Sequence, residues 1–187
     1  MYSRTVVAIP ASYNEDQSLE TVSTYKYIKY LESRGAQCVM TTAGTSHFSL
    51  LNVEEIHNLN AAVVQSFNGE KIIGVPALSE YQAKSFIDKA NEYIDDNSYL
   101  MVLYPERYYG EAPIAAYIRS LRAETPNKLY VHGKTLRNAT GGSWDYTSGV
   151  INGLYHEGAL RGVKEEHSQL NKSYNFVSEL HPEIDII

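Results

Sequence analysis

The stretch LRGVKEE at residues 160–166 ends a short apolar segment with a lysine that is followed by two glutamates. In a β-strand alternate residues share a face, so Leu160, Gly162 and Lys164 point in the same direction. Gly162 leaves space beside Lys164, and a lysine held in a tight pocket can lose its proton and act as a nucleophile. A solvated surface lysine is the commoner outcome for an isolated residue of this type. The choice between the two interpretations depends on the rest of the chain.

Six further short apolar segments also have the pattern of β-strands, and segments with a helical pattern separate them. The strand-like segments are residues 6–9, 38–41, 72–75, 100–103, 129–131, 160–163 and 184–187. Between them, apolar residues repeat at helical spacing at Val53, Ile56, Leu59, Val63 and Phe67, at Ala83, Phe86, Ile87, Ala90 and Ile94, at Ile114, Tyr117, Ile118 and Leu121, and at Leu170, Tyr174, Val177 and Leu180. Alternation of strands and helices predicts parallel strands joined by right-handed crossovers.

The spacing of these units favours a TIM (β/α)8-type barrel. They recur about every 30 residues, close to the ~250 residues over eight units of such a barrel. A doubly wound open sheet is the competing architecture. It usually carries a glycine-rich phosphate loop after its first strand, and IPASYN at residues 9–14 is not such a loop. We therefore predict a single α/β domain of the β/α-barrel type over residues 1–187.

The strand count leaves the predicted barrel incomplete, at about seven strands. A barrel closes only when its last unit pairs with its first, and an open parallel edge tends to associate with other chains. Three explanations fit the count: the chain is a relative truncated at its C-terminus, a partner supplies the closure, or one segment is misassigned. The sequence does not distinguish them. It does favour a homo-oligomer, because an open edge has to be covered.

Composition and charge exclude several classes of function. The formal net charge of -6 argues against a nucleic-acid partner or a basic membrane-surface protein. The single cysteine, Cys38, excludes an internal disulfide and a cysteine-rich zinc site. The sequence contains no membrane-spanning run and no signal-peptide core, so we expect a cytoplasmic protein. The histidines are scattered and form no HExxH motif, so we expect neither a metal nor a cofactor.

Residues with reactive side chains follow several predicted strands, at the end where TIM barrels place their active sites. Residues 44–46 follow the second strand, residues 108–109 follow the fourth, and the sixth ends in Lys164. On the fifth strand, Tyr130 and His132 share a face, while their neighbours are apolar and suit the helical layer. We therefore expect Tyr130 to point inward.

A lysine, hydroxyl groups and tyrosines at one rim suit Schiff-base chemistry on a 2-keto acid. The lysine amine attacks the carbonyl to give an imine, which acts as an electron sink. A tyrosine can shuttle protons between the amine, the carbinolamine and the substrate oxygen. A turn that combines glycine with hydroxyl side chains offers hydrogen-bond donors for the substrate carboxylate. Each feature is common by itself, and only their arrangement on successive strand ends favours this chemistry.

The same residues resemble the dihydrodipicolinate synthase / N-acetylneuraminate lyase family, which comprises class I pyruvate-dependent aldolases on a β/α barrel. Gly162-Val163-Lys164-Glu165 is similar to the family's Schiff-base lysine strand, and Leu129-Tyr130 is similar to the strand that carries its catalytic tyrosine. Gly44-Thr45-Ser46 is similar to the start of its GTTGE loop, and residues 51–55 follow at the right distance. The similarity extends from Val6 through the seventh strand.

The resemblance implies a role for each matching residue. Lys164 would form the imine with pyruvate or another 2-keto acid. Tyr130 would transfer protons, and Thr45 would pass protons to it. Ser46, with Gly44 in the same loop, would hold the substrate carboxylate.

Two further roles and one alternative function follow from the resemblance. Tyr109, or its neighbour Tyr108, would complete the proton relay, and Arg137 would meet the second substrate's carboxylate.

The chain departs from the family pattern at His47-Phe48, at residues 131–133 and in ending before an eighth strand. The predicted function is a 4-hydroxy-tetrahydrodipicolinate synthase-like lyase or synthase that joins a 2-keto acid to an aldehyde or cleaves the product. The alternative is a catalytically inactive, truncated relative that acts as a binding or assembly protein.

Overall fold

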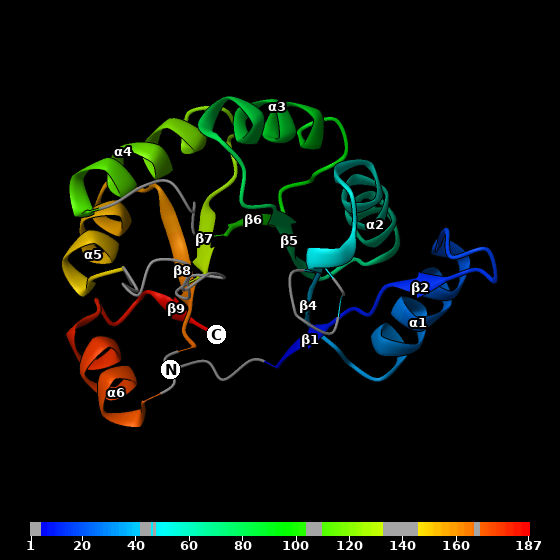
Figure 1. Cartoon of the computed structure of the whole chain (residues 1–187). Helices are drawn as coiled ribbons and strands as arrows, with labels where there is room; N and C mark the ends of the chain where they lie inside the picture. Colours follow the sequence, from blue (N-terminus) through cyan, green and yellow to red (C-terminus); the bar gives the residue numbers. More distant parts are fainter. Residues whose placement is uncertain (1–4, 42–45, 47, 104–109, 133–145, 167–168) are drawn as a thin grey trace. The chain divides into compact units, whose positions relative to one another are not determined.

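The computed structural model describes residues 5–41, 46, 48–103, 110–132, 146–166 and 169–187. Its main sheet has the strand order β1-β4-β5-β6-β7-β8-β9, which is also the order of these strands along the chain (Figure 1). The strands are β1 (Val6–Ala8), β4 (Cys38–Met40), β5 (Glu70–Val75), β6 (Ser98–Val102), β7 (Leu129–His132), β8 (Leu160–Lys164) and β9 (Asp185–Ile186). Each of the predicted strand segments coincides with one of them.

Helices separate the strands of this sheet. Within the described residues they are α1 (Thr21–Ser33), α2 (Val53–Ser66), α3 (Glu80–Ala90), α4 (Glu111–Arg122), α5 (Ser148–His156) and α6 (Leu170–Glu179). Helices between the successive strands of the main sheet, and the order of that sheet along the chain, make the fold an incomplete α/β barrel of the TIM type, as the sequence predicts. Across the described ranges, every helix is too short or too polar to cross a membrane.

The chain divides into two compact units, Met1–Pro76 with Lys89–Leu100 and Ala77–Asp88 with Met101–Ile187. In the first unit, β1, β4 and β5 pair in parallel, and α2 packs against both α1 and β5. In the second unit, β7, β8 and β9 pair in parallel, and α5 packs against β8 and its neighbours α4 and α6 (Figure 1). The single domain over residues 1–187 stays a prediction.

The sequence sets the start and the buried face of α2. Asn52 and Glu55 form a complete capping box, in which each side chain accepts a hydrogen bond from the other residue's backbone N–H. Ile56, Leu59 and Val63 of the predicted stripe are buried, because residues three and four apart share a face of a helix.

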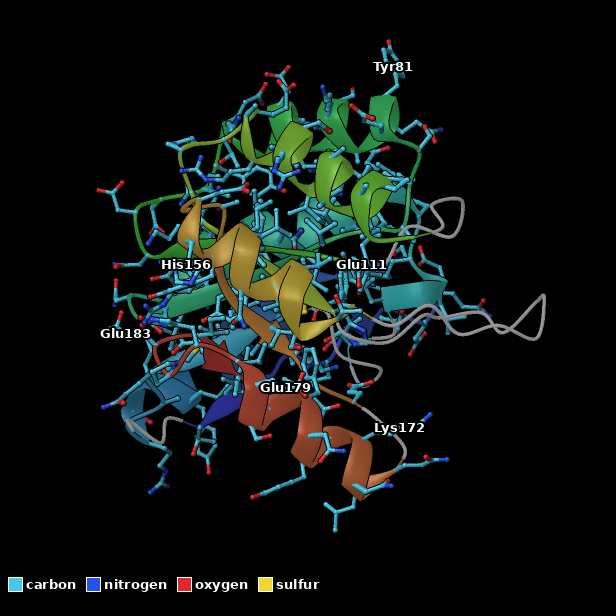
Figure 2. All side chains as sticks on the ribbon, turned by 90° about the vertical axis from the view of Figure 1, so that its left-hand side faces the viewer. Tyr81, Glu111, His156, Lys172, Glu179 and Glu183 are labelled. Carbon is cyan, nitrogen blue, oxygen red and sulfur yellow. The ribbon has the colours of Figure 1, made fainter. Side chains whose placement is uncertain are left out.

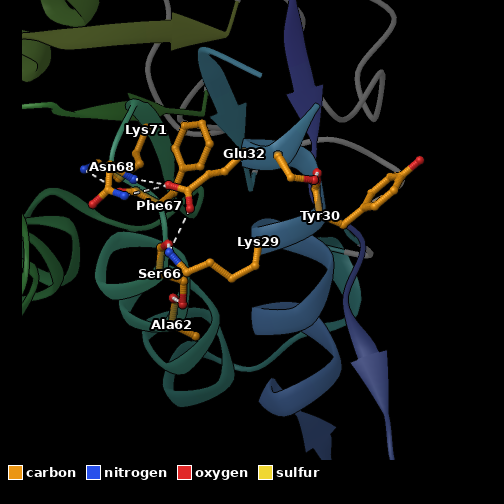
Figure 3. Close-up of polar contacts among 9 residues, drawn as sticks. Lys29, Tyr30, Glu32, Ala62, Ser66, Phe67, Asn68 and Lys71 are labelled. Atoms are coloured by element: carbon orange, nitrogen blue, oxygen red, sulfur yellow. Dashed lines mark hydrogen bonds and ion pairs between the residues drawn. The ribbon is translucent and has the colours of Figure 1, made fainter. Parts of the chain in front are cut away.

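Polar contacts in the first unit tie α1 to the end of α2 (Figure 3). Lys29 donates to the backbone carbonyl of Ser66 at 2.6 Å and pairs with Glu32 at 2.8 Å. Glu32 in turn accepts the backbone N–H of Asn68 at 2.7 Å. The last carbonyls of a helix lack hydrogen-bond partners within the helix, so Lys29 supplies a donor that the carbonyl of Ser66 would otherwise lack.

The predicted stripe on α6 is wrong at two positions. Leu170 and Tyr174 are 86% and 73% exposed, whereas Phe176 and Leu180 are buried. With 3.6 residues per turn, Tyr174 lies about 160° from Phe176 around the helix, so both cannot face the sheet. Exposed charged residues, among them Lys172 and Glu179, also lie along this helix (Figure 2).

Two helices and one hairpin carry no clear signal in the sequence. The stripe of α1 consists of Thr24, Ile28 and Leu31, and exposed tyrosines on the same helix obscure it. The short helix α5 includes Gly149 and Gly153, and glycine is a poor helix former. Strands β2 (Ser12–Tyr13) and β3 (Leu19–Glu20) form a two-stranded antiparallel sheet.

Candidate active site

Lys164 is the last residue of β8, and the pairing of β8 with its neighbours determines what lies around it. Tyr130 and His132 of β7 pair with Gly162 and Lys164, and Gly162 pairs with Asp185 of β9. Paired residues of neighbouring strands point to the same side of a sheet, so all five side-chain positions share one face. The sequence predicts this common face for Tyr130 and His132, and the register adds Lys164 and Asp185 to it.

Gly162 makes room for the ring of Tyr130. A Cβ atom at this position would lie 2.5 Å from Cε1 of Tyr130 and 2.3 Å from the backbone oxygen of Asp185. Only glycine therefore lets the tyrosine ring lie across β8. The ring is fully buried, and its hydroxyl donates to Oδ2 of Asp185 at 2.7 Å. The same carboxylate oxygen lies 3.0 Å from Nε of Arg161.

Lys164 is largely enclosed and has two polar partners. Its side chain is 12% exposed, and its Nζ forms an ion pair with Oε1 of Glu166. Its Nζ also lies 3.2 Å from Nε2 of His132, within hydrogen-bond distance. That nitrogen lies 3.6 Å from Oε2 of Glu166, so lysine, imidazole and carboxylate form one cluster. A binding protein without turnover would be expected to leave this lysine solvated, and the observed burial is the opposite.

The cluster combines a potential nucleophile with a group that can exchange its proton. A lysine amine attacks a carbonyl only after it has lost a proton, and imidazole is the side chain best suited to accept one near neutral pH. No three histidine, cysteine, aspartate or glutamate side chains in the described part of the chain are arranged to hold a metal ion.

The predicted carboxylate-binding residue Ser46 lies in the first unit. Its side chain is buried, and its Oγ has no hydrogen-bond partner within the described residues. A buried hydroxyl without a partner is costly unless a bound molecule or water satisfies it. The other predicted site residues, Gly44, Thr45, Tyr108, Tyr109 and Arg137, lie outside the described residues.

The structure thus places Lys164 and Tyr130 on one face and adds residues that sequence reasoning did not assign to the site. These are His132, Glu166 and Asp185. A signal for His132 was present, since it lies two residues after Tyr130 on the same face of the strand. No signal exists for Asp185, because its contact with Tyr130 spans 55 positions of the chain.

Comparison with known proteins agrees with this geometry at the level of the fold. The chain is similar to YagE, a prophage protein of the dihydrodipicolinic acid synthase family from E. coli K12 solved in complex with pyruvate, with TM-score 0.84 and 15% identity. The chain has the fold of the dihydrodipicolinate synthase family. Dihydrodipicolinate synthase from Aquifex aeolicus gives TM-score 0.82 at 13% identity, and 2-keto 3-deoxygluconate aldolase from Picrophilus torridus gives 0.79 at 15%. The resemblance expected from the sequence is therefore confirmed for the fold.

These similarities cover all of this chain but only part of the solved proteins. The chain spans 63% of the length of YagE, 62% of the Aquifex synthase and 66% of the Picrophilus aldolase. No protein-family model matches the sequence, and no curated protein matches it significantly. These fold neighbours are a dihydrodipicolinic acid synthase family protein, a synthase and an aldolase, and the specific reaction of this chain is a separate question.

Proposed function

We propose that this protein is a class I aldolase-type lyase or synthase in which Lys164 forms an imine with pyruvate or another 2-keto acid. The observation that carries the proposal is the enclosed Lys164 side chain at the carboxyl end of β8, with an imidazole nitrogen 3.2 Å from its amine. In TIM barrels this end of the strands is where catalytic residues lie. YagE, which has the same fold, was solved with pyruvate.

The proposed reaction starts with attack of the Lys164 amine on the keto carbon. Water leaves the carbinolamine, and the resulting iminium withdraws electrons so that the neighbouring carbon can lose a proton. The enamine formed in this way attacks an aldehyde carbonyl, and the reverse sequence cleaves the product. No metal or cofactor is required for these steps.

Tyr130 is the proposed proton-transfer residue. Its hydroxyl donates to Asp185 and keeps lone pairs that can accept a proton from the substrate side. Proton transfer through such a chain runs from the substrate through the tyrosine oxygen toward the carboxylate. Asp185 would then serve as the second member of the relay, next to the proposed Thr45.

The remaining roles in the proposal come from the resemblance. Ser46 and Gly44 bind the keto-acid carboxylate, and the unpartnered, buried Oγ of Ser46 supports this. Tyr109, or Tyr108, completes the relay, and Arg137 meets the carboxylate of the aldehyde substrate. A homo-oligomeric state and a cytoplasmic location belong to the same proposal.

Reductive trapping tests the proposal directly. The protein is incubated with pyruvate, reduced with borohydride, digested and mapped by mass spectrometry. We expect N-(1-carboxyethyl)lysine at Lys164 and none at Lys71, a second enclosed lysine that serves as an internal control. The Lys164→Arg variant should give no adduct. Folded protein that gives no adduct with a panel of 2-keto acids would contradict the proposal and favour the catalytically inactive binding or assembly protein.

A further inference from the structure

His132 lies at the carboxyl end of β7, directly opposite Lys164 in the register of the sheet. Its side chain is 5% exposed, and it reaches the lysine with Nε2. In the tautomer whose Nε2 carries no proton, this nitrogen directs a lone pair at the lysine amine and can accept a proton from it. This arrangement positions a base at the atom that must be deprotonated before imine formation.

Glu166 lies two residues beyond the end of β8 and approaches the same nitrogen. Its Oε2 lies 3.6 Å from Nε2 of His132, and its Oε1 pairs with Nζ of Lys164. One carboxylate therefore contacts both groups between which a proton would move. A negative charge near an imidazole favours the imidazolium form, so the proton keeps a stabilising partner after it has left the lysine.

We propose that His132 is the general base and acid of imine formation at Lys164, and that Glu166 positions and stabilises it. This inference rests on the proposed function and names a residue for a step that the function leaves open. Nε2 takes one proton from the ammonium, and the freed amine attacks the keto carbon as the carbonyl π bond breaks. A second proton moves from nitrogen to the alkoxide, and the imidazolium then protonates the carbinolamine hydroxyl, which leaves as water. The ammonium and the keto acid have become an iminium and one water molecule, and His132 is again neutral.

The surroundings of His132 favour this role over a purely structural contact. A lysine with a purely structural role needs only hydrogen-bond acceptors for its ammonium group. A carboxylate and a backbone carbonyl can supply these acceptors. An imidazole adds the ability to accept and return a proton near neutral pH. The charged groups that face the imidazole include Lys164 from β8 and Glu166 from the segment that follows it. The pH dependence of imine formation should therefore report on this group of three residues.

The test measures the rate of imine formation with pyruvate, by borohydride quenching at successive times between pH 5 and pH 10. In the wild-type protein we expect a rate that rises with the loss of the imidazole proton and then levels off. His132→Gln keeps a polar group near Nε2 but no base, and should be about 100-fold slower at pH 7, within the range of general acid–base catalysis. Its rate should approach that of the wild type at pH 10, where hydroxide in solution can take the proton in place of the imidazole. Added imidazole should restore part of the rate in His132→Ala.

Two further variants make the result decisive. His156→Gln changes an exposed histidine at the end of α5 and should match the wild type at every pH. Glu166→Gln should lower the plateau rate about ten-fold and move the low-pH limb of the profile to lower pH, because the imidazolium loses its stabilising charge. If the His132 variants do not fold, Glu166→Gln still tests the proposed role of His132. Wild-type rates and profiles in the His132 and Glu166 variants would overturn the inference, whereas absence of an adduct in the wild-type protein would overturn the proposed function instead.

Discussion

Two enclosed lysines lie at opposite ends of their strands, and their surroundings differ in kind. Lys71, close to the start of β5, is 1% exposed; it donates to the backbone carbonyl of Phe67 at 3.1 Å and pairs with Asp95 at 2.6 Å. Figure 3 shows Lys71 beside Phe67. Lys164, at the end of β8, is less enclosed and meets the His132 imidazole as well as a carboxylate.

This difference shows that burial alone does not make a lysine reactive. Burial raises the pKa of the Asp95 carboxyl, but hydrogen bonds from Lys71 and Ser98 hold it below its usual range. Lys71 therefore faces a permanent carboxylate and a carbonyl, neither of which takes its proton near neutral pH. Lys71 also lies near the start of its strand, and residues at that end of a TIM barrel contribute to stability rather than to catalysis. Lys164 has a partner that can exchange protons, at the face that serves catalysis.

The largest effect is expected where the sheet packs most tightly beside Lys164. Gly162→Ala would place a Cβ atom 2.3 Å from the backbone oxygen of Asp185, which cannot move without breaking the pairing of β8 with β9. We expect a loss of about 3 kcal/mol in the free energy of unfolding, at the upper end for overpacked sites. Urea unfolding measures it.

Gly153→Ala is the matched control for this substitution. Its Cβ would meet no atom within 4 Å, and it lies in α5, where alanine is favoured by about 0.5 to 1 kcal/mol. If both variants change stability by the same small amount, the close packing of Tyr130 across Gly162 is wrong.

The next effect separates the carboxylate partners of the two lysines. Asp95→Asn keeps an oxygen for Ser98 and the backbone of Asn97 but leaves the Lys71 ammonium buried without a countercharge. We expect a loss of about 2 to 3 kcal/mol in stability, somewhat less than for a fully buried pair because Asp95 is partly exposed.

Glu166→Gln should cost less than about 1 kcal/mol, because the Lys164 side chain is 12% exposed, against 1% for Lys71, and so keeps more contact with water. Its main effect should be on the rate of imine formation, whereas Asp95→Asn should leave trapping at Lys164 intact. Thermal or urea unfolding, together with borohydride trapping, measures both variants. A reversed pattern, with Glu166 controlling stability and Asp95 the adduct, would break the comparison of the two lysines.

The last effect depends on pH and concerns a histidine that we expect to be structural. Burial lowers the pKa of His57 to about 4, with a further contribution from Lys89, and its Nδ1 lies 2.9 Å from the hydroxyl of Tyr93. An unfolded histidine titrates near 6.5, so below that pH the unfolded chain binds more protons than the folded one. The stabilisation is complete above pH 6.5 and is lost as the pH falls toward 4. We expect a loss of about 2 kcal/mol between pH 7 and pH 4.5.

Urea unfolding at both pH values checks this expectation. His57→Gln should lack that share of the decline, while the exposed control His156→Gln should keep it. An equal decline in the wild type and His57→Gln would show that His57 does not contribute. A smaller decline in His57→Gln than in the wild type would instead mean that His57 and His132 differ as the two lysines do, one histidine serving stability and the other proton transfer.

Much of the fold could be predicted because parallel strands are buried on both faces and read as short apolar runs. Every predicted segment became a strand, from Val6 to the last residues of the chain. The misses have physical causes: tyrosines conceal the stripe of α1, glycines weaken the signal of α5, and the apolar Leu170 and Tyr174 of α6 face solvent. For the site, alternation along a strand placed Tyr130 with His132 and Gly162 with Lys164. The spacing of residues could not show which side chains meet across strands.

The sequence by itself determined the strand–helix alternation, the reactive lysine at a strand end and the glycine beside it. These are local properties, because side-chain direction alternates with a period of two residues in any strand. Only the tertiary structure decided that Lys164 lies opposite His132 and that Tyr130 crosses Gly162 to reach Asp185. Strand register and side-chain reach depend on packing between segments that are distant in the chain, including a register shift between Leu129 and Tyr130. The difference between a structural and a reactive lysine is therefore a property of the folded sheet.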